Sequence, residues 1–141
     1  MSFVIDPHSE SNLVGVHPDL VAVVRDCAAN GVLPFWFGVT EGLRSLAQQK
    51  IDVAAGKSST MHSRHLDGHA VDLVTIIAGK ASWAWPPYHV LATQMKASAA
   101  RLGIPIECGA DWTQFPDAPH YQLPWDSYPS TMPAPPVTTD A

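Results

Sequence analysis

The sequence predicts an α+β fold in which helices pack on a small, mostly antiparallel sheet. The chain has 141 residues, of which 46% are hydrophobic and 15% charged, so it can bury the core of one domain. Segments with helical periodicity are interspersed with short apolar segments typical of strands, in the order helix, strand, helix, strand, helix, strand, strand. We expect this domain over residues 1–128 and a Pro-rich tail over residues 129–141.

Three segments carry the signals of helices. After residues 17–19, apolar residues recur with helical spacing until Asn30-Gly31 supplies a stop. Ser45 and Gln48 resemble a capping box, which begins a helix that runs to about Ala55. A third helix ends at Gly103, and its apolar stripe consists of Tyr88, Leu91, Met95 and Leu102. Residues 1–16 carry no clear pattern, and we interpret them as an arm that packs on the domain.

Four short segments are expected to be strands. Residues 35–39 read as a buried strand, and residues 70–77 form an apolar, β-branched run around Asp72 that indicates a central strand. Residues 104–108 contain Pro105, which places them at an edge or at a strand start. A loop rich in Gly, Asp, Trp and Pro leads into the last strand, residues 120–123.

Composition excludes several classes of protein. Eight Lys and Arg against thirteen Asp and Glu give a net charge of −5, which argues against a nucleic-acid partner. No apolar run reaches the roughly 18–20 residues of a membrane helix, so we expect no stable membrane insertion. The first residues lack the basic and apolar regions of a secretory signal peptide. Two cysteines are too few for a disulfide framework and fit a reducing compartment.

The segment from Ser63 to Asp72 carries the most chemistry. On one helix, His65 and Asp72 would be separated by roughly 10 Å of rise, too far to share an ion. Asp67-Gly68 is instead a hairpin signal, and a hairpin would place these two side chains diagonally, about 7–8 Å apart. A carboxylate on a buried strand is also costly unless it is paired or ligated. We therefore expect His65 and Asp72 to converge on a metal ion.

A catalytic zinc site usually takes three protein ligands and leaves one position for water. The best third donor is His120, which lies on a turn that enters the last strand. From the same turn, Asp117 could reach the water and transfer its proton to a leaving amine. Arg44, just before the second helix, is a candidate cation for an anionic substrate group or a developing oxyanion.

These motifs resemble the zinc D,D-carboxypeptidase and L-alanyl-D-glutamate endopeptidase family, which includes vancomycin-resistance D,D-peptidases and many phage endolysins. The matching patterns are Ser63-x-His65-x-x-Gly68-x-Ala70-x-Asp72 and Asp117-x-x-His120. Residues 40–49 also resemble the arginine-bearing segment of the family, and residues 109–123 are closest to its endolysin branch. The resemblance spans about residues 34–125.

The resemblance implies one Zn²⁺ per chain, with His65, Asp72 and His120 as ligands. It further implies that Asp117 is the general base and that Arg44 assists the substrate or the transition state. We expect Ser63, Gln49 and Trp112 to contact the substrate or to support these groups, with Trp83 and Trp85 as further candidates for the wall of the groove. His62 and His69 are expected at surface or supporting positions.

The function that follows is that of an endolysin: a zinc-dependent peptidoglycan endopeptidase that cleaves the L-Ala-D-Glu bond of the stem peptide. By the same resemblance, the enzyme accumulates in the host cytoplasm without a signal peptide and reaches the wall after the membrane is permeabilised. We expect a monomer.

Three alternatives stay open at this point. A D,D-carboxypeptidase of the same family would cleave a D-Ala-containing bond. A cysteine peptidase would pair Cys108 with His120, and it would be sensitive to thiol alkylation rather than to chelators. A non-catalytic wall-binding module would hold a structural zinc, normally closed by four protein ligands.

Overall fold

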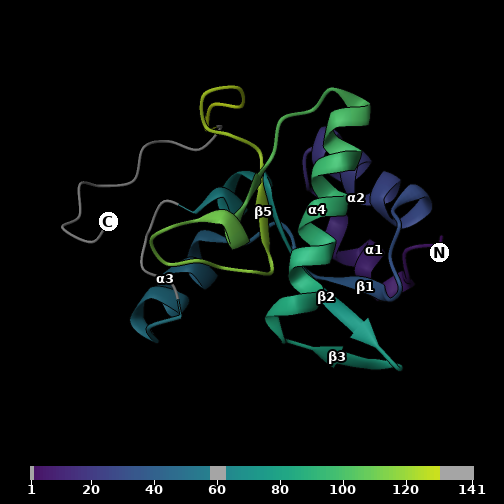
Figure 1. Ribbon diagram of the computed structural model, residues 1–141. Helices are drawn as coiled ribbons and strands as arrows, with labels where there is room; N and C mark the ends of the chain where they lie inside the picture. Colours follow the sequence, from purple (N-terminus) through teal and green to yellow (C-terminus); the bar gives the residue numbers. More distant parts are fainter. Residues whose placement is uncertain (1, 58–62, 131–141) are drawn as a thin grey trace.

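The computed structural model describes residues 2–57 and 63–130 and confirms the α+β fold (Figure 1). Its α-helices are α1 (Pro7–Leu13), α2 (Pro18–Asn30), α3 (Leu46–Ala54) and α4 (Trp85–Leu102). Its strands are β1 (Trp36–Glu41), β2 (Ala70–Ile77), β3 (Lys80–Ser82), β4 (Glu107–Cys108) and β5 (His120–Gln122). Two 3₁₀ helices, η1 (Arg64–Asp67) and η2 (Gly109–Asp111), complete the described elements. Residues 131–141, most of the expected tail, lie outside the described residues.

All strand pairs of the sheet are antiparallel, in the order β1-β2-β5-β4. The long central strand β2 pairs with β1 along one edge and with both β5 and β3 along the other. The sequence did not predict β3, which returns from β2 through a tight turn at Ala78 and Gly79, both with positive φ.

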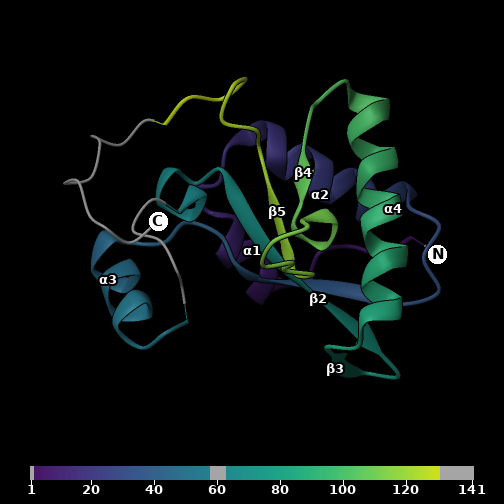
Figure 2. The same cartoon turned by 60° about the vertical axis from the view of Figure 1, so that its left-hand side comes forward.

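The two faces of the sheet differ in composition, because successive residues of a strand point to opposite faces. Val71 and Leu73 of β2 and Tyr121 of β5 belong to the buried apolar core. Their neighbours Asp72 and His120 lie opposite each other in the register, on the other face. Helices α2 and α4 supply most of the helical core residues, and in both views β5 lies between α3 and α4 (Figures 1 and 2). The core and the polar residues are therefore on opposite sides of the same strands.

Local capping explains where most helices begin and end. His17 accepts a hydrogen bond from the Asp19 amide at the start of α2, and Ser45 accepts one from the Gln48 amide at the start of α3. Gly103, with φ of 67°, ends α4. These three positions agree with the sequence-based expectations.

Helix α1 was missed, since residues 1–16 were expected only as an arm. Asp6 caps it through the Ser9 amide, and Pro7 occupies its first position. The helix covers the outer edge of β1: Ser9 Oγ accepts the Val39 N–H at 2.8 Å, and the Asn12 amide donates to the Val39 carbonyl at 2.8 Å. Within the described residues, no helix is both long and apolar enough to span a membrane.

The expected hairpin at Asp67-Gly68 is wrong. Residues 64–67 form a 3₁₀ helix that Ser63 caps at its start and Gly68 ends in the left-handed conformation, with φ of 70°. A Cβ on Gly68 would lie 2.2 Å from the Gly15 carbonyl oxygen, so this turn is packed directly against the chain before α2. The same Asp-Gly signal thus serves a helix end instead of a strand connection.

Candidate metal centre

Three side chains that the sequence singled out converge on one point of the sheet's polar face. They are His65 on η1, Asp72 on β2 and His120 on β5. Each offers one ligand atom, and the three atoms lie within 4.8 Å of one another. Asp72 Oδ1 is 3.3 Å from His65 Nε2 and 3.2 Å from His120 Nδ1. The sequence correctly predicted that these side chains converge, but a 3₁₀ helix and not a hairpin connects His65 to β2.

The backbone orients His65. Its Nδ1 lies 2.7 Å from the Gly42 carbonyl oxygen, which can only accept, so Nδ1 carries the proton. The lone pair is then on Nε2, and this buried atom has no hydrogen-bond partner. The Arg44 amide also donates to the His65 carbonyl at 2.9 Å, which holds η1 against the loop before α3.

Asp72 lies between the two imidazoles in the interior of the sheet. Burial alone would raise the pKa of its carboxyl. A hydrogen bond from His120 and the nearby His65 ring outweigh this effect and hold that pKa far below its usual range. Asp72 is therefore a carboxylate at neutral pH.

His120 is oriented by Gln122, two residues further along β5. Because the two residues alternate with Tyr121, their side chains share the polar face. His120 Nε2 lies 2.8 Å from Gln122 Oε1, and both side chains are buried. Gln122 was not predicted as a site residue, although the His120-x-Gln122 spacing on a strand is a signal that could have found it.

This donor set fits a zinc ion. Two imidazoles and one carboxylate are typical ligands of Zn²⁺, and atoms bound to it tetrahedrally lie about 3.3 Å apart. The two separations from Asp72 Oδ1 given above, 3.3 Å and 3.2 Å, are close to that spacing. His65 Nε2, buried and without a partner, is explained if it binds a cation.

Asp117 and Arg44 line the same pocket, together with all three residues of the cluster. Asp117 is exposed as a residue, but partial desolvation of its carboxyl and the nearby Asp72 charge raise its pKa. Arg44 pairs with Glu41 and donates to Gln49 Oε1 at 2.6 Å, through Nε and Nη1 respectively. Within the described residues, its Nη2 makes no hydrogen bond.

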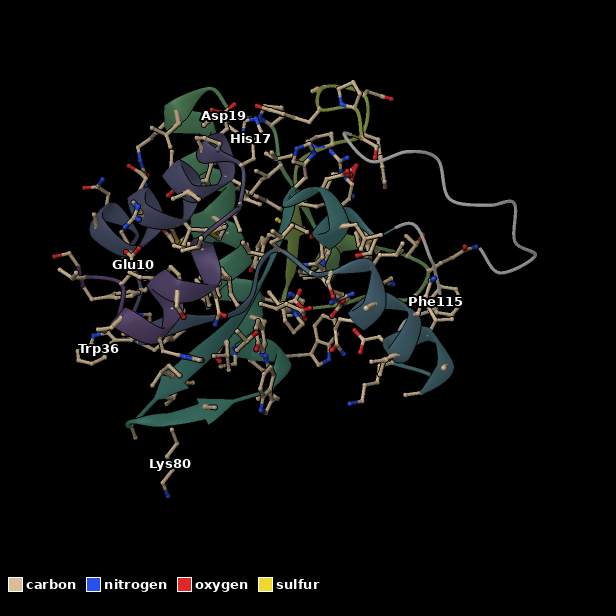
Figure 3. The ribbon with its side chains drawn as sticks, turned by 180° about the vertical axis from the view of Figure 1, so that it is seen from behind. Glu10, His17, Asp19, Trp36, Lys80 and Phe115 are labelled. Atoms are coloured by element: carbon tan, nitrogen blue, oxygen red, sulfur yellow. The ribbon has the colours of Figure 1, made fainter. Side chains whose placement is uncertain are left out.

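The pocket has a volume of about 820 Å³ and a partly aromatic wall. Trp112, one of the expected wall residues, lies with its ring centre 5.2 Å from that of His120. Phe115 and Trp125 also line the pocket and were not predicted; Figure 3 shows Phe115 at the end of the molecule that carries α3, away from Trp36. Trp83 and Trp85, the further candidates for this wall, do not line the pocket.

Those two tryptophans lie elsewhere, between the β3 hairpin and the start of α4. Trp83 stacks on Tyr88 with ring centres 6.5 Å apart, and Trp85 lies near His89. Their sequence position just before a helix gave no information about which side of the sheet they reach.

Ser63 and Gln49 support other residues of the site. Ser63 lines the pocket, and its hydroxyl accepts a hydrogen bond from the His65 amide at 3.2 Å. Gln49 is fully buried and holds the Arg44 guanidinium. His69 is also buried, packed against His17 and Tyr128 rather than at the surface, and His62 lies outside the described residues.

Arg64 is a further residue that the sequence did not single out. Its guanidinium is buried, donates to the Leu123 carbonyl at 3.2 Å, pairs with Asp67 and stacks 4.1 Å from the Trp125 ring centre. It ties η1 to the segment after β5. Its partners in the segment after β5 are about 60 residues away, so no local pattern could have revealed this role.

Cys108 does not face His120. In the β4–β5 register it lies opposite Tyr121, so its side chain points into the apolar core, whereas His120 points to the polar face. Burial raises the pKa of its thiol to about 12. A thiol that is buried, apolar and protonated at neutral pH is a poor nucleophile.

Comparisons with known proteins agree with this geometry. The family model described as phage L-alanyl-D-glutamate peptidase matches residues 1–123. A relative from Escherichia phage T5, the L-alanyl-D-glutamate peptidase, is 32% identical over 116 residues, which cover 79% of this chain and 83% of the relative. The protein of the same name from Listeria phage A118 is 36% identical over 91 residues, 64% of this chain and 31% of that longer relative.

A solved structure is also similar over nearly its whole length. The crystal structure of the Serratia marcescens L-Ala D-Glu endopeptidase ChiX matches with a TM-score of 0.83 and 45% sequence identity. The match covers 92% of this chain and 95% of the solved chain. At this identity the likeness extends beyond the fold.

Proposed function

Because the chain belongs to the phage L-alanyl-D-glutamate peptidase family, we propose that it is a zinc-dependent endolysin that hydrolyses the L-Ala-D-Glu bond of the peptidoglycan stem peptide. The observation that supports a bound metal ion is that three ligand atoms converge, one of which, the buried Nε2 of His65, has no hydrogen-bond partner. His65, Asp72 and His120 would hold one Zn²⁺ per chain.

A zinc ion bound there supplies a Lewis acid that polarises a carbonyl group and lowers the pKa of water. Asp117 stands beside the ligands in the pocket and accepts a proton from the attacking water. Its raised pKa suits the second half of the task, in which the acid returns that proton to the D-Glu nitrogen as the C–N bond breaks. The products are a carboxylate on L-Ala and a free amine on D-Glu.

Arg44 provides a positive charge in the pocket that contains the ligands. Glu41, Gln49 and Asp52 fix its guanidinium, which leaves Nη2 to bind a substrate carboxylate or the developing oxyanion. Trp112 and Trp125 give the pocket apolar surfaces against which the peptide packs. An anionic, partly apolar peptide suits this combination of charge and aromatic wall.

The test is digestion of purified murein sacculi by the full chain, followed by mass spectrometry of the released fragments. We expect new N-terminal D-Glu. Release of D-Ala without new D-Glu termini would instead identify a D,D-carboxypeptidase and overturn the proposed bond.

Inhibition separates the remaining mechanisms. A chelator should abolish cleavage, zinc should restore it, and thiol alkylation should leave it unchanged. The opposite pattern would favour the cysteine peptidase. A protein that keeps its zinc tightly but releases nothing from sacculi would be a binding module with a structural ion.

The cellular setting follows from the same family. We propose that the enzyme accumulates in the host cytoplasm as a monomer, with one catalytic domain over residues 1–128, and acts on the wall once the host membrane is permeabilised. Sedimentation of the purified chain tests the monomer, and lysis on co-expression with a membrane-permeabilising protein tests the route to the wall.

A further inference from the structure

We propose that Glu107 and Gln122 together hold the His120 ring with its Nε2–H donated to Gln122, so that Nδ1 is directed at the metal site. The inference rests on the proposed zinc site and adds two positioning residues to it, neither of which reaches the ion itself. It follows from the sheet register and from the hydrogen-bonding capacity of each group.

The register brings four polar residues of three strands onto one face. Asp72 of β2 lies opposite His120 of β5, and Gln122 of β5 lies opposite Glu107 of β4. Because His120 and Gln122 are two residues apart, the four side chains form a row across the sheet. The contacts along this row measure 3.2 Å (Asp72 Oδ1 to His120 Nδ1), 2.8 Å (His120 Nε2 to Gln122 Oε1) and 3.0 Å (Gln122 Nε2 to Glu107 Oε2).

The direction of every hydrogen bond in this row follows from Glu107. An ionised carboxylate has no proton to donate, so the group of Gln122 that faces it must be the NH₂. The amide oxygen of Gln122 then faces His120 and can only accept. His120 Nε2 must therefore carry a proton and donate it to Gln122, which leaves Nδ1 facing Asp72. In the metal-free ring Nδ1 can itself donate to the Asp72 carboxylate, and a bound metal would take the place of that proton.

In both histidines of the site, one ring nitrogen donates a hydrogen bond and the other faces the metal site, but different groups accept the hydrogen bond. His65 is fixed by the backbone carbonyl of Gly42, which accepts a hydrogen bond whatever the side chain of residue 42. His120 is fixed by an amide side chain, and an amide can turn over and present its NH₂ instead. Gln122 needs a partner that sets its direction, and Glu107 is that partner.

This difference predicts that residue 107 controls metal affinity without touching the metal. A donor at this position would draw the Gln122 oxygen toward itself and turn the NH₂ toward His120. The ring would then be favoured with its proton on Nδ1, which cannot bind a metal in that state. Partners of metal-binding histidines typically change metal affinity by about 10–100-fold when they are replaced.

The experiment measures zinc affinity of the full chain by competition with a chromophoric chelator. We expect Glu107→Lys and Gln122→Leu each to weaken zinc binding about 10–100-fold. Glu107→Gln should stay within about threefold of the wild-type affinity, because its amide oxygen can still accept from Gln122. Asp111→Lys is the matched charge control, since it makes the same change of sign on the neighbouring η2 at an exposed carboxylate paired with Lys96.

A second measurement reads the proton on Nε2 directly and does not depend on metal or activity. Long-range ¹H–¹⁵N NMR of the metal-free chain should show a protonated Nε2 in the wild type and in Glu107→Gln, whether or not Nδ1 also donates to Asp72. In Glu107→Lys, where the Gln122 NH₂ would face the ring, Nε2 should lose its proton. Thermal unfolding of the same metal-free samples identifies any variant that loses affinity because it fails to fold.

The outcomes distinguish this inference from the proposed function. If the wild type binds zinc and Glu107→Lys binds it equally well, or keeps the proton on Nε2, the inference is wrong and the zinc site stands. An equal loss of affinity in Asp111→Lys would assign the effect to charge alone and would also overturn the inference. If the wild type binds no zinc, the proposed function itself fails.

Discussion

The two faces of β2 and β5 carry different properties of the molecule. On one face, Leu73 and Tyr121 are fully buried in the apolar core beneath α2 and α4. On the other, Asp72 and His120, their immediate neighbours in the sequence, form the candidate metal centre. Alternation along a strand thus separates stability from chemistry by a single residue. Substitutions on the two faces should therefore change different measurements.

The largest effect is expected on the polar face, from Asp117→Ala. Loss of a general acid–base group should lower kcat about 10²–10⁴-fold, while zinc content and melting temperature stay close to those of the wild type. Steady-state cleavage of a muropeptide and metal analysis of the same sample measure both quantities. Asp111→Ala, which removes an exposed carboxylate from the same loop region, is the matched control and should keep its activity. Loss of zinc from Asp117→Ala would mean that this residue belongs to the ligand set.

On the core face, Leu73→Ala should mainly lower stability. Removal of a fully buried leucine costs about 2–5 kcal/mol of unfolding free energy. Denaturant unfolding measures this loss, and zinc titration of the folded variant should give an affinity within about threefold of the wild type. A large loss of affinity at little cost in stability would show that the two faces are coupled through the strand.

A smaller effect is expected at the sheet edge, from Asp6→Ala at the cap of α1. Removal of the cap should cost about 1 kcal/mol at neutral pH. Hydrogen bonds from Ser9 hold the pKa of Asp6 below its ordinary value of 3.8, so the carboxylate stabilises the fold fully above that value. The contribution is lost as the pH falls through the lower folded-state pKa. The difference between wild type and variant, measured by unfolding at a series of pH values, should therefore shrink in acid; a difference that grew would contradict the capping role.

The smallest effect on activity is expected from Cys108→Ala. The thiol points into the core and its pKa is raised to about 12, so it should react slowly with iodoacetamide in the folded chain. Cleavage of sacculi by this variant should stay within about twofold of the wild type, because Cys108 points into the core whereas His120 points to the opposite face of the sheet. A loss of activity that matched the extent of alkylation would revive the cysteine mechanism.

Local signals predicted much of this fold. Caps at His17 and Ser45 and the glycine after α4 are read from neighbouring residues, and the structure uses them in the same way. The strand around Asp72 was also predicted with its correct bounds, because its run of apolar and β-branched residues is long and only Asp72 interrupts it.

Where a signal suits two structures, tertiary contacts decided between them. Gly68 in the left-handed conformation can form a hairpin turn or end a helix, and the close approach to Gly15 together with the buried Arg64 selects the helix end. Two of the contacts that were missed join residues that are distant in the sequence. Gln122 meets Glu107 across two strands, and Arg64 meets a segment about 60 residues away. Neither pairing leaves a local pattern.

The buried guanidinium of Arg64 has a consequence for how an ion would enter. It holds the turn that carries His65 against the chain that leaves β5, so the two histidine-bearing segments are joined before any cation arrives. When a protein segment loses conformational freedom on binding, the affinity falls. A metal site whose segments are already fixed avoids most of that entropic penalty. Metal uptake by this protein should therefore require little rearrangement of the chain, because the segments that carry the ligands are already held in place.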